Sequence, residues 1–209
     1  MSVTLAKRLI SASEYHKMAE VGILTPEDKV ELLNGEIIKM SPIGSLHAGY
    51  LNILNELFAD ELGKKVHVQT QSSVRLSKFS EPEPDLMILK RRKDHYLTRF
   101  PRPKDVYLVV EVSDTTLEKD RLIKAPLYAK AGISEYWIVN VVDKQLEIFS
   151  NPRDGKYEQE SITKSKKIAY FAAFDINIKA SDVFILSNLT GEIADFLYKN
   201  KDCDDYKGT

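Results

Sequence analysis

The stretch VYLVVEVSDTTLEKD, residues 106–120, places a glutamate inside a run of apolar, β-favouring residues. Valines at positions 109, 110 and 112 flank Glu111, which is the pattern of a strand buried on both faces. A buried carboxylate is costly unless it meets a cation, a metal ion or several hydrogen-bond donors. Glu111 therefore needs such a partner, and other parts of the chain must supply it.

The bulk composition is that of an ordinary globular protein. The chain has 209 residues, 43% hydrophobic and 29% charged, enough for one domain with a sizeable core. No apolar run approaches the roughly 18–20 residues of a transmembrane helix, and the N-terminus lacks the apolar segment of a secretory signal. The single cysteine, Cys203, excludes an internal disulfide and a cysteine-rich zinc site. We expect a cytoplasmic protein with no membrane association.

The net charge of −1 limits the functions to consider. A simple nucleic-acid binder usually carries a basic excess, so this balance counts against one. It counts less against a metal-dependent nuclease, because bound cations offset the acidic ligands of such an enzyme.

Apolar spacing and turn signals predict alternating helices and strands. Helices are predicted at residues 11–22, 25–36, 45–62, 116–131 and 190–200. Strands are predicted at residues 36–41, 66–70, 73–76, 86–90, 106–113, 135–141, 144–150, 157–162 and 181–186. The strand–helix–strand unit at 106–140 is of the parallel crossover type, and a turn at 151–156 adds a β-hairpin. We expect one α/β domain over residues 1–200 and a disordered tail at 201–209.

Three acidic residues occupy unusual positions. Asp85 begins the apolar strand LMILK, Glu111 interrupts the run described above, and Glu31 has apolar neighbours in a predicted helix. Each has a structural explanation as well: a Pro-Asp turn, a buried arginine partner, or exposure on one side of a short helix. Two acids on neighbouring strands can also meet at one end of a sheet and hold Mg²⁺, which prefers oxygen ligands.

The helix that follows Glu111 offers a cation. Asp120, Lys124 and Tyr128 have the spacing i, i+4, i+8 and so lie near one face. A metal polarises a phosphoryl oxygen, and a positioned lysine stabilises the developing negative charge. Lys124 is therefore a candidate catalytic residue. The alternative is a solvent-exposed Asp120–Lys124 pair worth about 0.3–0.5 kcal/mol.

These motifs resemble a known nuclease group. PD at 84–85 followed by EVS at 111–113 resembles the PD-(D/E)XK nuclease superfamily, although Ser113 stands where lysine is usual. The continuation EVSDTTLEKDRLIKAPLYAKAGISEYWIVN is similar to a large bacterial family of candidate restriction-type endonucleases, formerly a domain of unknown function. ELLNGEIIKMSP and the helix containing His47 fit the N-terminal half of that family, so the resemblance covers about residues 10–185.

The resemblance implies a restriction-endonuclease-like α/β fold, with a central mixed β-sheet flanked by helices and an added β-hairpin. It implies that Asp85 and Glu111 hold Mg²⁺, for which Mn²⁺ can substitute. The Val112 carbonyl is a candidate further ligand, and Glu31 would complete the site. Lys124 would replace the missing strand lysine from the neighbouring helix. The implied activity is metal-dependent hydrolysis of phosphodiester bonds in DNA by an endonuclease.

Two other functions stay open at this point. One is a catalytically inactive nucleic-acid-binding or interaction module on the same fold, which Ser113 and the near-zero charge favour. The other is a phosphoesterase acting on RNA or smaller substrates, because the sequence contains no readable base-recognition element. A homodimer is expected by analogy alone, since double-strand cleavage needs two sites.

Weaker signals concern contacts with substrate. The basic loop at 90–104 follows Asp85 in sequence and is a candidate phosphate-binding segment, although such loops are often only solvated. His47 opens the predicted long helix, whose N-terminus is a candidate contact for a substrate phosphate, although we expect an ordinary half-exposed histidine. Gln69 and Gln71 are candidates for lining a cleft.

Overall fold

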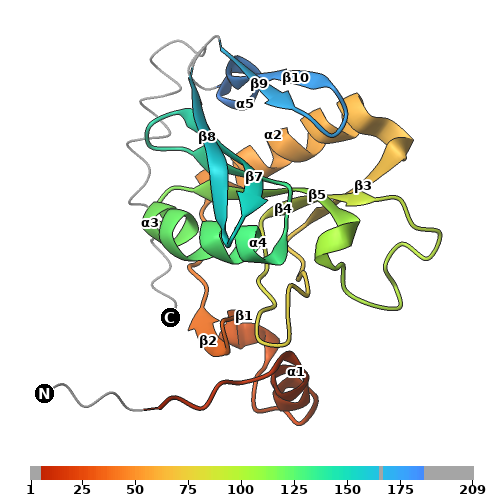
Figure 1. The fold of residues 1–209 in the computed structure, drawn as a ribbon, viewed down its shortest axis with the longest axis vertical. Coiled ribbons are helices and arrows are strands. Elements are labelled where there is room, and N and C mark those ends of the chain that lie inside the picture. Colours follow the sequence, from red (N-terminus) through yellow and green to blue (C-terminus); the bar gives the residue numbers. More distant parts are fainter. Residues whose placement is uncertain (1–5, 165–166, 186–209) are drawn as a thin grey trace, which may run out of the picture.

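A six-stranded mixed sheet forms the centre of the protein (Figure 1). The computed structural model describes residues 6–164 and 167–185. The strands are β3 (Val66–Thr70), β4 (Leu86–Lys90), β5 (Val106–Ser113), β6 (Glu135–Asn140), β7 (Gln145–Arg153) and β8 (Lys156–Lys164), in the order β3-β4-β5-β6-β7-β8. β5 and β6 pair in parallel and the other neighbours are antiparallel, as the predicted crossover unit requires.

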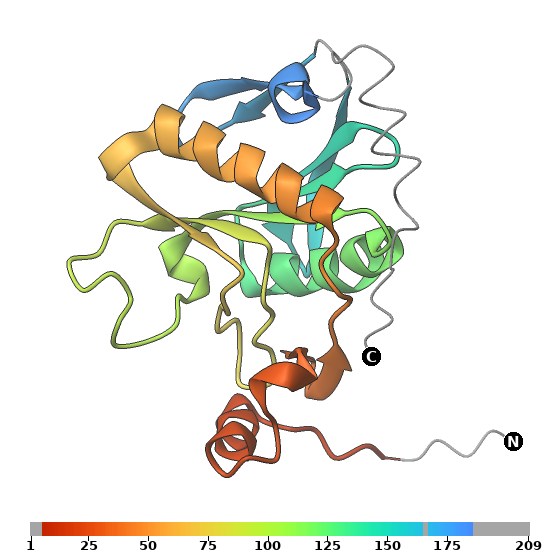
Figure 2. The ribbon, with the colours of Figure 1, turned by 180° about the vertical axis from the view of Figure 1, so that it is seen from behind.

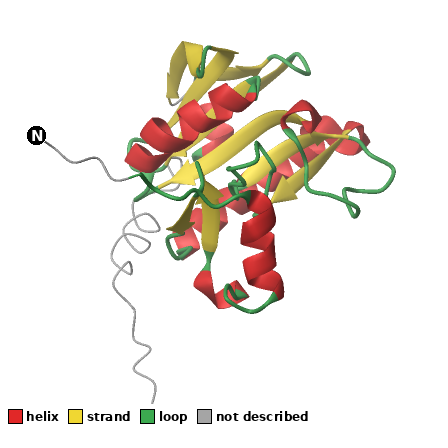
Figure 3. Ribbon diagram, turned by 60° about the horizontal axis from the view of Figure 1, so that its bottom comes forward, coloured by secondary structure: helices red, strands yellow, loops and turns green. Residues whose placement is uncertain are grey.

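Helices cover both faces of this sheet. The long helix α2 (Ser45–Leu62) crosses one face (Figure 2), and it has the predicted bounds. The other face carries a continuous helical segment made of α3 (Leu117–Lys119), a π-helical turn (Asp120–Lys124) and α4 (Ala125–Ala131). Gly132, with φ of 79°, ends it as predicted. Figure 3 shows the strands between these helices, so the α/β prediction is confirmed.

The alternation of β5 decides where Glu111 points. Val110 and Val112 pack in the apolar layer beneath α2, together with Trp137 of β6. Val109 packs in the opposite layer, beneath α4. Because side chains alternate along a strand, Glu111 shares the α4 face with Val109. The prediction of a strand buried on both faces is confirmed.

The N-terminal part forms a separate layer below the sheet in Figure 1. It contains α1 (Ala12–Glu20), with the predicted capping box at Ser11, a 3₁₀ turn (Pro26–Asp28), β1 (Val30–Leu33) and β2 (Glu36–Lys39). The predicted helix at 25–36 is therefore wrong. Lys29 leaves the helical region at φ 44°, and Asn34-Gly35, both at positive φ, form the two-residue turn of a β1–β2 hairpin. Glu31 consequently lies on a strand.

Two further strand predictions are wrong. Residues 73–76 form irregular chain, in which Val74 and Arg75 donate backbone hydrogen bonds to Pro82 and Pro101. Residues 181–186 were predicted as a strand, but the described part of that segment contains a short helix, α5 (Ala180–Val183).

Two hairpins extend the structure beyond these elements. The β7–β8 hairpin is confirmed, with its turn narrowed to Asp154-Gly155. A second hairpin, β9 (Ile168–Phe171) with β10 (Ile176–Lys179), was not predicted. Short 3₁₀ turns complete the described elements, at Gly63–Lys65 and Pro103–Asp105. The predicted helix at 190–200 and the tail at 201–209 lie outside the described residues.

Candidate active site

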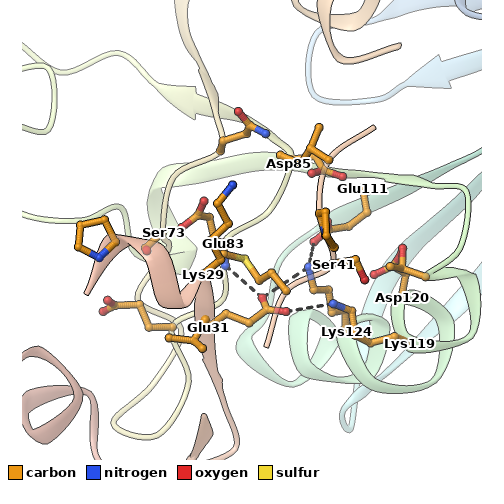
Figure 4. Close-up of a pocket in the computed structure, with 18 of the residues that line it drawn as sticks. Lys29, Glu31, Ser41, Ser73, Glu83, Asp85, Glu111, Lys119, Asp120 and Lys124 are labelled. Carbon is orange, nitrogen blue, oxygen red and sulfur yellow. Dashed lines mark hydrogen bonds and ion pairs between the residues drawn. The ribbon is translucent and has the colours of Figure 1, made fainter. Parts of the chain in front are cut away.

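A cavity of about 870 Å³ lies where the N-terminal layer meets the start of β4 and the end of β5 (Figure 4). Its lining includes every residue for which a catalytic or metal-binding role was predicted: Glu31, Asp85, Glu111, Val112 and Lys124. These residues come from segments up to 93 positions apart in the chain, between 31 and 124. The fold therefore gathers them at one place.

Only one of the two carboxylate oxygens of Glu111 accepts hydrogen bonds from protein side chains. Its residue is 3% exposed, and its Oε1 accepts hydrogen bonds from Lys124 Nζ at 2.8 Å and from the Tyr128 hydroxyl at 2.9 Å. No donor among the described residues reaches Oε2. Since no fully buried polar side-chain atom in this part of the chain lacks a partner, Oε2 is accessible from the cavity. Burial raises the pKa of Glu111, and the nearby Lys124 ammonium opposes that rise.

Lys124 lies between two glutamates. Besides Glu111, it approaches Oε2 of Glu31 at 3.5 Å, and only 4% of the residue is exposed. Burial by itself would lower the pKa of this lysine, but the charges of Glu111, Glu31 and Asp120 and the hydrogen bond to Glu111 together outweigh burial and raise it. Lys124 is thus a buried cation inside an acidic cluster, not half of an exposed pair with Asp120 (Figure 4).

Glu31 is held by two further groups. Its Oε1 accepts from Lys119 Nζ at 3.3 Å, and its Oε2 accepts from the backbone N–H of Glu83 at 3.3 Å. Glu83 also lines the cavity, and burial together with the charge of Glu31 raises the pKa of its carboxyl. Glu83 was not predicted. The sequence EPEPD at 81–85 contains a signal for Glu83, because Glu83 lies two residues before Asp85 and residues two apart in extended chain point to the same side.

Asp85 is fixed at both oxygens. Its Oδ2 accepts from the backbone N–H of Val112 at 2.7 Å, and its Oδ1 lies 2.9 Å from Nε2 of His47. His47 is therefore a partner of Asp85, which its sequence context did not indicate. Burial lowers the pKa of His47, but the bond to Asp85 and the negative charges of Asp85, Asp114 and Asp120 together outweigh burial and raise it. The N–H and C=O of one strand residue face the same edge, so the Val112 carbonyl points to the Asp85 side.

Ser113, the departure from the superfamily pattern, anchors the helical segment. Its hydroxyl donates to Asp120 Oδ2 at 2.6 Å, and the Thr116 hydroxyl donates to the same oxygen at 2.6 Å. Asp120 begins the π-helical turn that ends at Lys124. π-Helical turns are rare and frequently occur at functional sites. The residue at the usual lysine position thus fixes the start of the turn that carries Lys124.

The donor atoms in the cavity fit a hard divalent cation. Asp85, Glu111 and the Val112 carbonyl offer only oxygen, the ligand that Mg²⁺ prefers. Within residues 6–164 and 167–185, no group of three or more His, Cys, Asp or Glu side chains converges as a metal site. Mg²⁺ does not require such a group, because it is commonly bound by one or two carboxylates and keeps several waters.

None of the basic side chains of the loop at 90–104 is among the described residues that line the cavity. The loop leaves the sheet at Lys90, the opposite end of β4 from Asp85. Two of its arginines pair with nearby aspartates, Arg92 with Asp94 at 2.7 Å and Arg99 with Asp105 at 2.6 Å. In the described chain, the part of the loop that lines the cavity is Phe100.

The two glutamines predicted as cleft-lining candidates occupy different positions. Gln71 lines the cavity, as expected. Gln69 is not among the described lining residues, and its side chain donates to Ser72 at 2.8 Å.

The fold and this cluster define a restriction-endonuclease-like α/β protein. The model of the Uma2 family, described as "Putative restriction endonuclease", matches residues 12–179, and the chain belongs to this family. The crystal structure of a "putative nuclease belonging to DUF820" from Anabaena variabilis has a similar fold. The two superpose with a TM-score of 0.67 at 11% identity, covering 84% of this chain and 98% of the other. No curated protein matches. Among the described helices, none has the length and apolar character to cross a membrane.

Proposed function

We propose that this protein is a metal-dependent endonuclease that hydrolyses phosphodiester bonds in DNA. The observation that carries the proposal is Glu111: a buried carboxylate with one oxygen bound to Lys124 and Tyr128 and the other accessible from the cavity that Asp85 lines. A carboxylate in this state is only partly compensated, and a bound cation would complete its environment. Membership of the Uma2 family supports the same activity.

Asp85 and Glu111 would hold Mg²⁺ together with the Val112 carbonyl. Mn²⁺ should replace it, because both ions accept carboxylate, carbonyl and water oxygens. When bound, such an ion polarises a phosphoryl oxygen and makes hydroxide accessible near neutral pH. His47 and the Val112 N–H keep the Asp85 carboxylate in one orientation.

Lys124 supplies positive charge at the reacting phosphate. It stays protonated because Glu111 and Glu31 surround it, so its role is to orient the attacking water or stabilise negative charge, not to remove a proton. Glu31 acts by holding the ammonium groups of Lys124 and Lys119 in the cavity. A lysine fixed in advance stabilises the transition state without reorganisation during the reaction.

Cleavage of supercoiled plasmid in Mg²⁺ and in Mn²⁺ tests the proposal. Wild type is compared with Asp85→Asn and with Asp60→Asn, an exposed residue of α2 purified in the same way as a matched control. We expect nicking by wild type and Asp60→Asn and none by Asp85→Asn. Equal cleavage by all three would indicate a contaminating nuclease. Inactive wild type, on plasmid and on RNA in parallel, would favour the non-cleaving binding module.

A further inference from the structure

The residues that line the cavity include two chemically different sets. One is charged and contains Glu31, Asp85, Glu111, Lys119 and Lys124. The other is largely apolar and contains Tyr15, His16, Leu24, Met40, Ile43 and Phe100. A nucleotide has the same division, since a charged phosphate is joined to a base with a flat, weakly polar face.

Two aromatic rings of the apolar set are suited to contact a base. His16 of α1 and Phe100 of the loop after β4 have ring centroids 5.5 Å apart and an interplanar angle of 42°. The imidazole is fixed, because its Nε2 lies 2.6 Å from Oε1 of Glu81, which also pairs with Arg75. Phe100 is 39% exposed although it is a large apolar side chain. A fixed, partly open aromatic pair on a cavity wall offers a stacking surface.

The aromatic pair lies near the acids. Glu81, which anchors His16, is four residues before Asp85, and four residues of extended chain span at most about 14 Å. A short run of nucleotides can cover this distance, with one base at His16 and a phosphate near Asp85.

The charged end of the cavity is enclosed. Glu111 and Lys124 are only 3% and 4% exposed, so the reacting phosphate must enter the cavity to reach them. Bases in a duplex are stacked on their neighbours and cannot lie against protein rings without leaving the helix. Bases of a single strand are free to do so.

We propose that this cavity binds a single-stranded segment of DNA, such as a free end or an unpaired loop, with a base against His16 and Phe100. The inference rests on the proposed function and deepens it by naming the form of the substrate. The cavity is acidic overall, with seven carboxylates (Glu31, Glu81, Glu83, Asp85, Glu111, Asp114 and Asp120) against three lysines (Lys29, Lys119 and Lys124). Binding of the anionic backbone therefore requires a divalent cation.

The test is fluorescence anisotropy of a labelled single-stranded oligonucleotide, and of the same sequence as a duplex, with the full-length protein in Ca²⁺. Phe100→Ala removes the stacking ring. Leu97→Ala is the matched control, because Leu97 is an 87% exposed apolar residue of the same loop outside the described cavity lining. We expect tighter binding of the single strand, about tenfold weaker binding by Phe100→Ala, no change in Leu97→Ala and recovery in Phe100→Trp.

Three results would overturn the inference: duplex bound as tightly as the single strand, Phe100→Ala binding like Leu97→Ala, or no single-strand binding by wild type. Cleavage in Mg²⁺ separates this inference from the proposed function. Duplex cleavage that is lost in Asp85→Asn but unchanged in Phe100→Ala would keep the nuclease and remove the single-strand site. Single-strand binding that depends on Phe100, without cleavage of any substrate, would keep the site and remove the nuclease.

Discussion

Two buried glutamates, Glu111 on β5 and Glu147 on β7, meet cations from the same π-helical turn. Lys124 reaches Glu111, and Arg121 reaches Glu147. The two residues are 3% and 0% exposed, so burial alone does not distinguish them. The number of hydrogen bonds that each carboxylate accepts distinguishes the two glutamates.

Glu147 is fully bonded. Arg121 donates to both of its oxygens, at 2.7 and 2.5 Å, and Asn140 and Gln145 donate to Oε1 at 2.9 and 2.8 Å. Burial raises the pKa of Glu147, but these donors outweigh burial and lower it. For Glu111 burial prevails and the pKa is raised. A carboxylate with a complete set of donors connects elements of the fold, whereas an incomplete set beside a cavity leaves capacity for a ligand.

The comparison predicts its largest stability effect at Glu147. Replacing it with alanine leaves Asn140, Gln145 and the Arg121 guanidinium without their acceptor, and we expect a loss of about 4 kcal/mol in unfolding free energy. Urea denaturation measures this loss. The control Glu158→Ala removes an exposed carboxylate and should change stability by less than about 0.5 kcal/mol. A loss below about 1 kcal/mol for Glu147→Ala would contradict the structural role that the comparison assigns to Glu147.

Glu135 sharpens the comparison, because it is a buried carboxylate outside the described cavity lining. It accepts a hydrogen bond from Trp137 Nε1 at 2.6 Å, and burial raises its pKa from 4.5 to about 7. Between these two values the folded state binds more protons than the unfolded state, so the contribution of Glu135 to stability falls as pH rises.

Glu135→Gln keeps the acceptor for Trp137 and removes the titration. Relative to wild type, we expect this variant to gain about 2 kcal/mol of unfolding free energy on going from pH 5 to pH 8. Urea denaturation of both proteins at the two pH values measures the gain. Parallel pH profiles would contradict the raised pKa.

Ser113→Ala tests the anchor of the π-helical turn. Asp120 keeps the bond from Thr116, so we expect stability to fall by only about 1 kcal/mol. Turnover should fall about tenfold with unchanged metal affinity, because Lys124 loses its fixed position. Single-turnover cleavage and metal titration separate the two effects. Ser113→Thr should restore turnover, and Ser134→Ala, an exposed serine, is the control. Unchanged turnover in Ser113→Ala would make the anchor irrelevant to catalysis.

Glu111→Gln should have the smallest effect on folding. It removes a charge that is only partly compensated, while Lys124 keeps its contact with Glu31. We expect the metal-free unfolding free energy to stay within about 1 kcal/mol of wild type in urea denaturation. A loss as large as that of Glu147→Ala would assign Glu111 the same structural role as Glu147.

The strongest parts of the site could be predicted because they depend on local periodicity. The apolar run around Glu111 indicated its burial, and the i, i+4, i+8 spacing placed Lys124 and Tyr128 near one helix face. The structure shows that this face meets Glu111. The contact between His47 and Asp85 joins segments 38 residues apart, and no local pattern reports such a pairing.

The error at Glu31 has a specific physical cause. Thr25-Pro26 resembles a helix start, and a 3₁₀ turn does begin there, but Asn34-Gly35 is stronger evidence for a hairpin. Because residues 25–36 were assigned to a helix, the contacts of Glu31 with Lys119 and Lys124 were not predicted. Only the family resemblance indicated that Glu31 belongs to the site.

The most direct test of the central claim is calorimetric titration with Mn²⁺ of wild type, Asp85→Asn, Glu111→Gln and Glu135→Gln. The claim is that Asp85 and Glu111 in the cavity bind a divalent ion and that a buried carboxylate elsewhere does not. We predict one binding event in wild type and in Glu135→Gln, and its loss in Asp85→Asn and Glu111→Gln. Equal Mn²⁺ binding by wild type and Asp85→Asn, or no binding by wild type, would contradict the account.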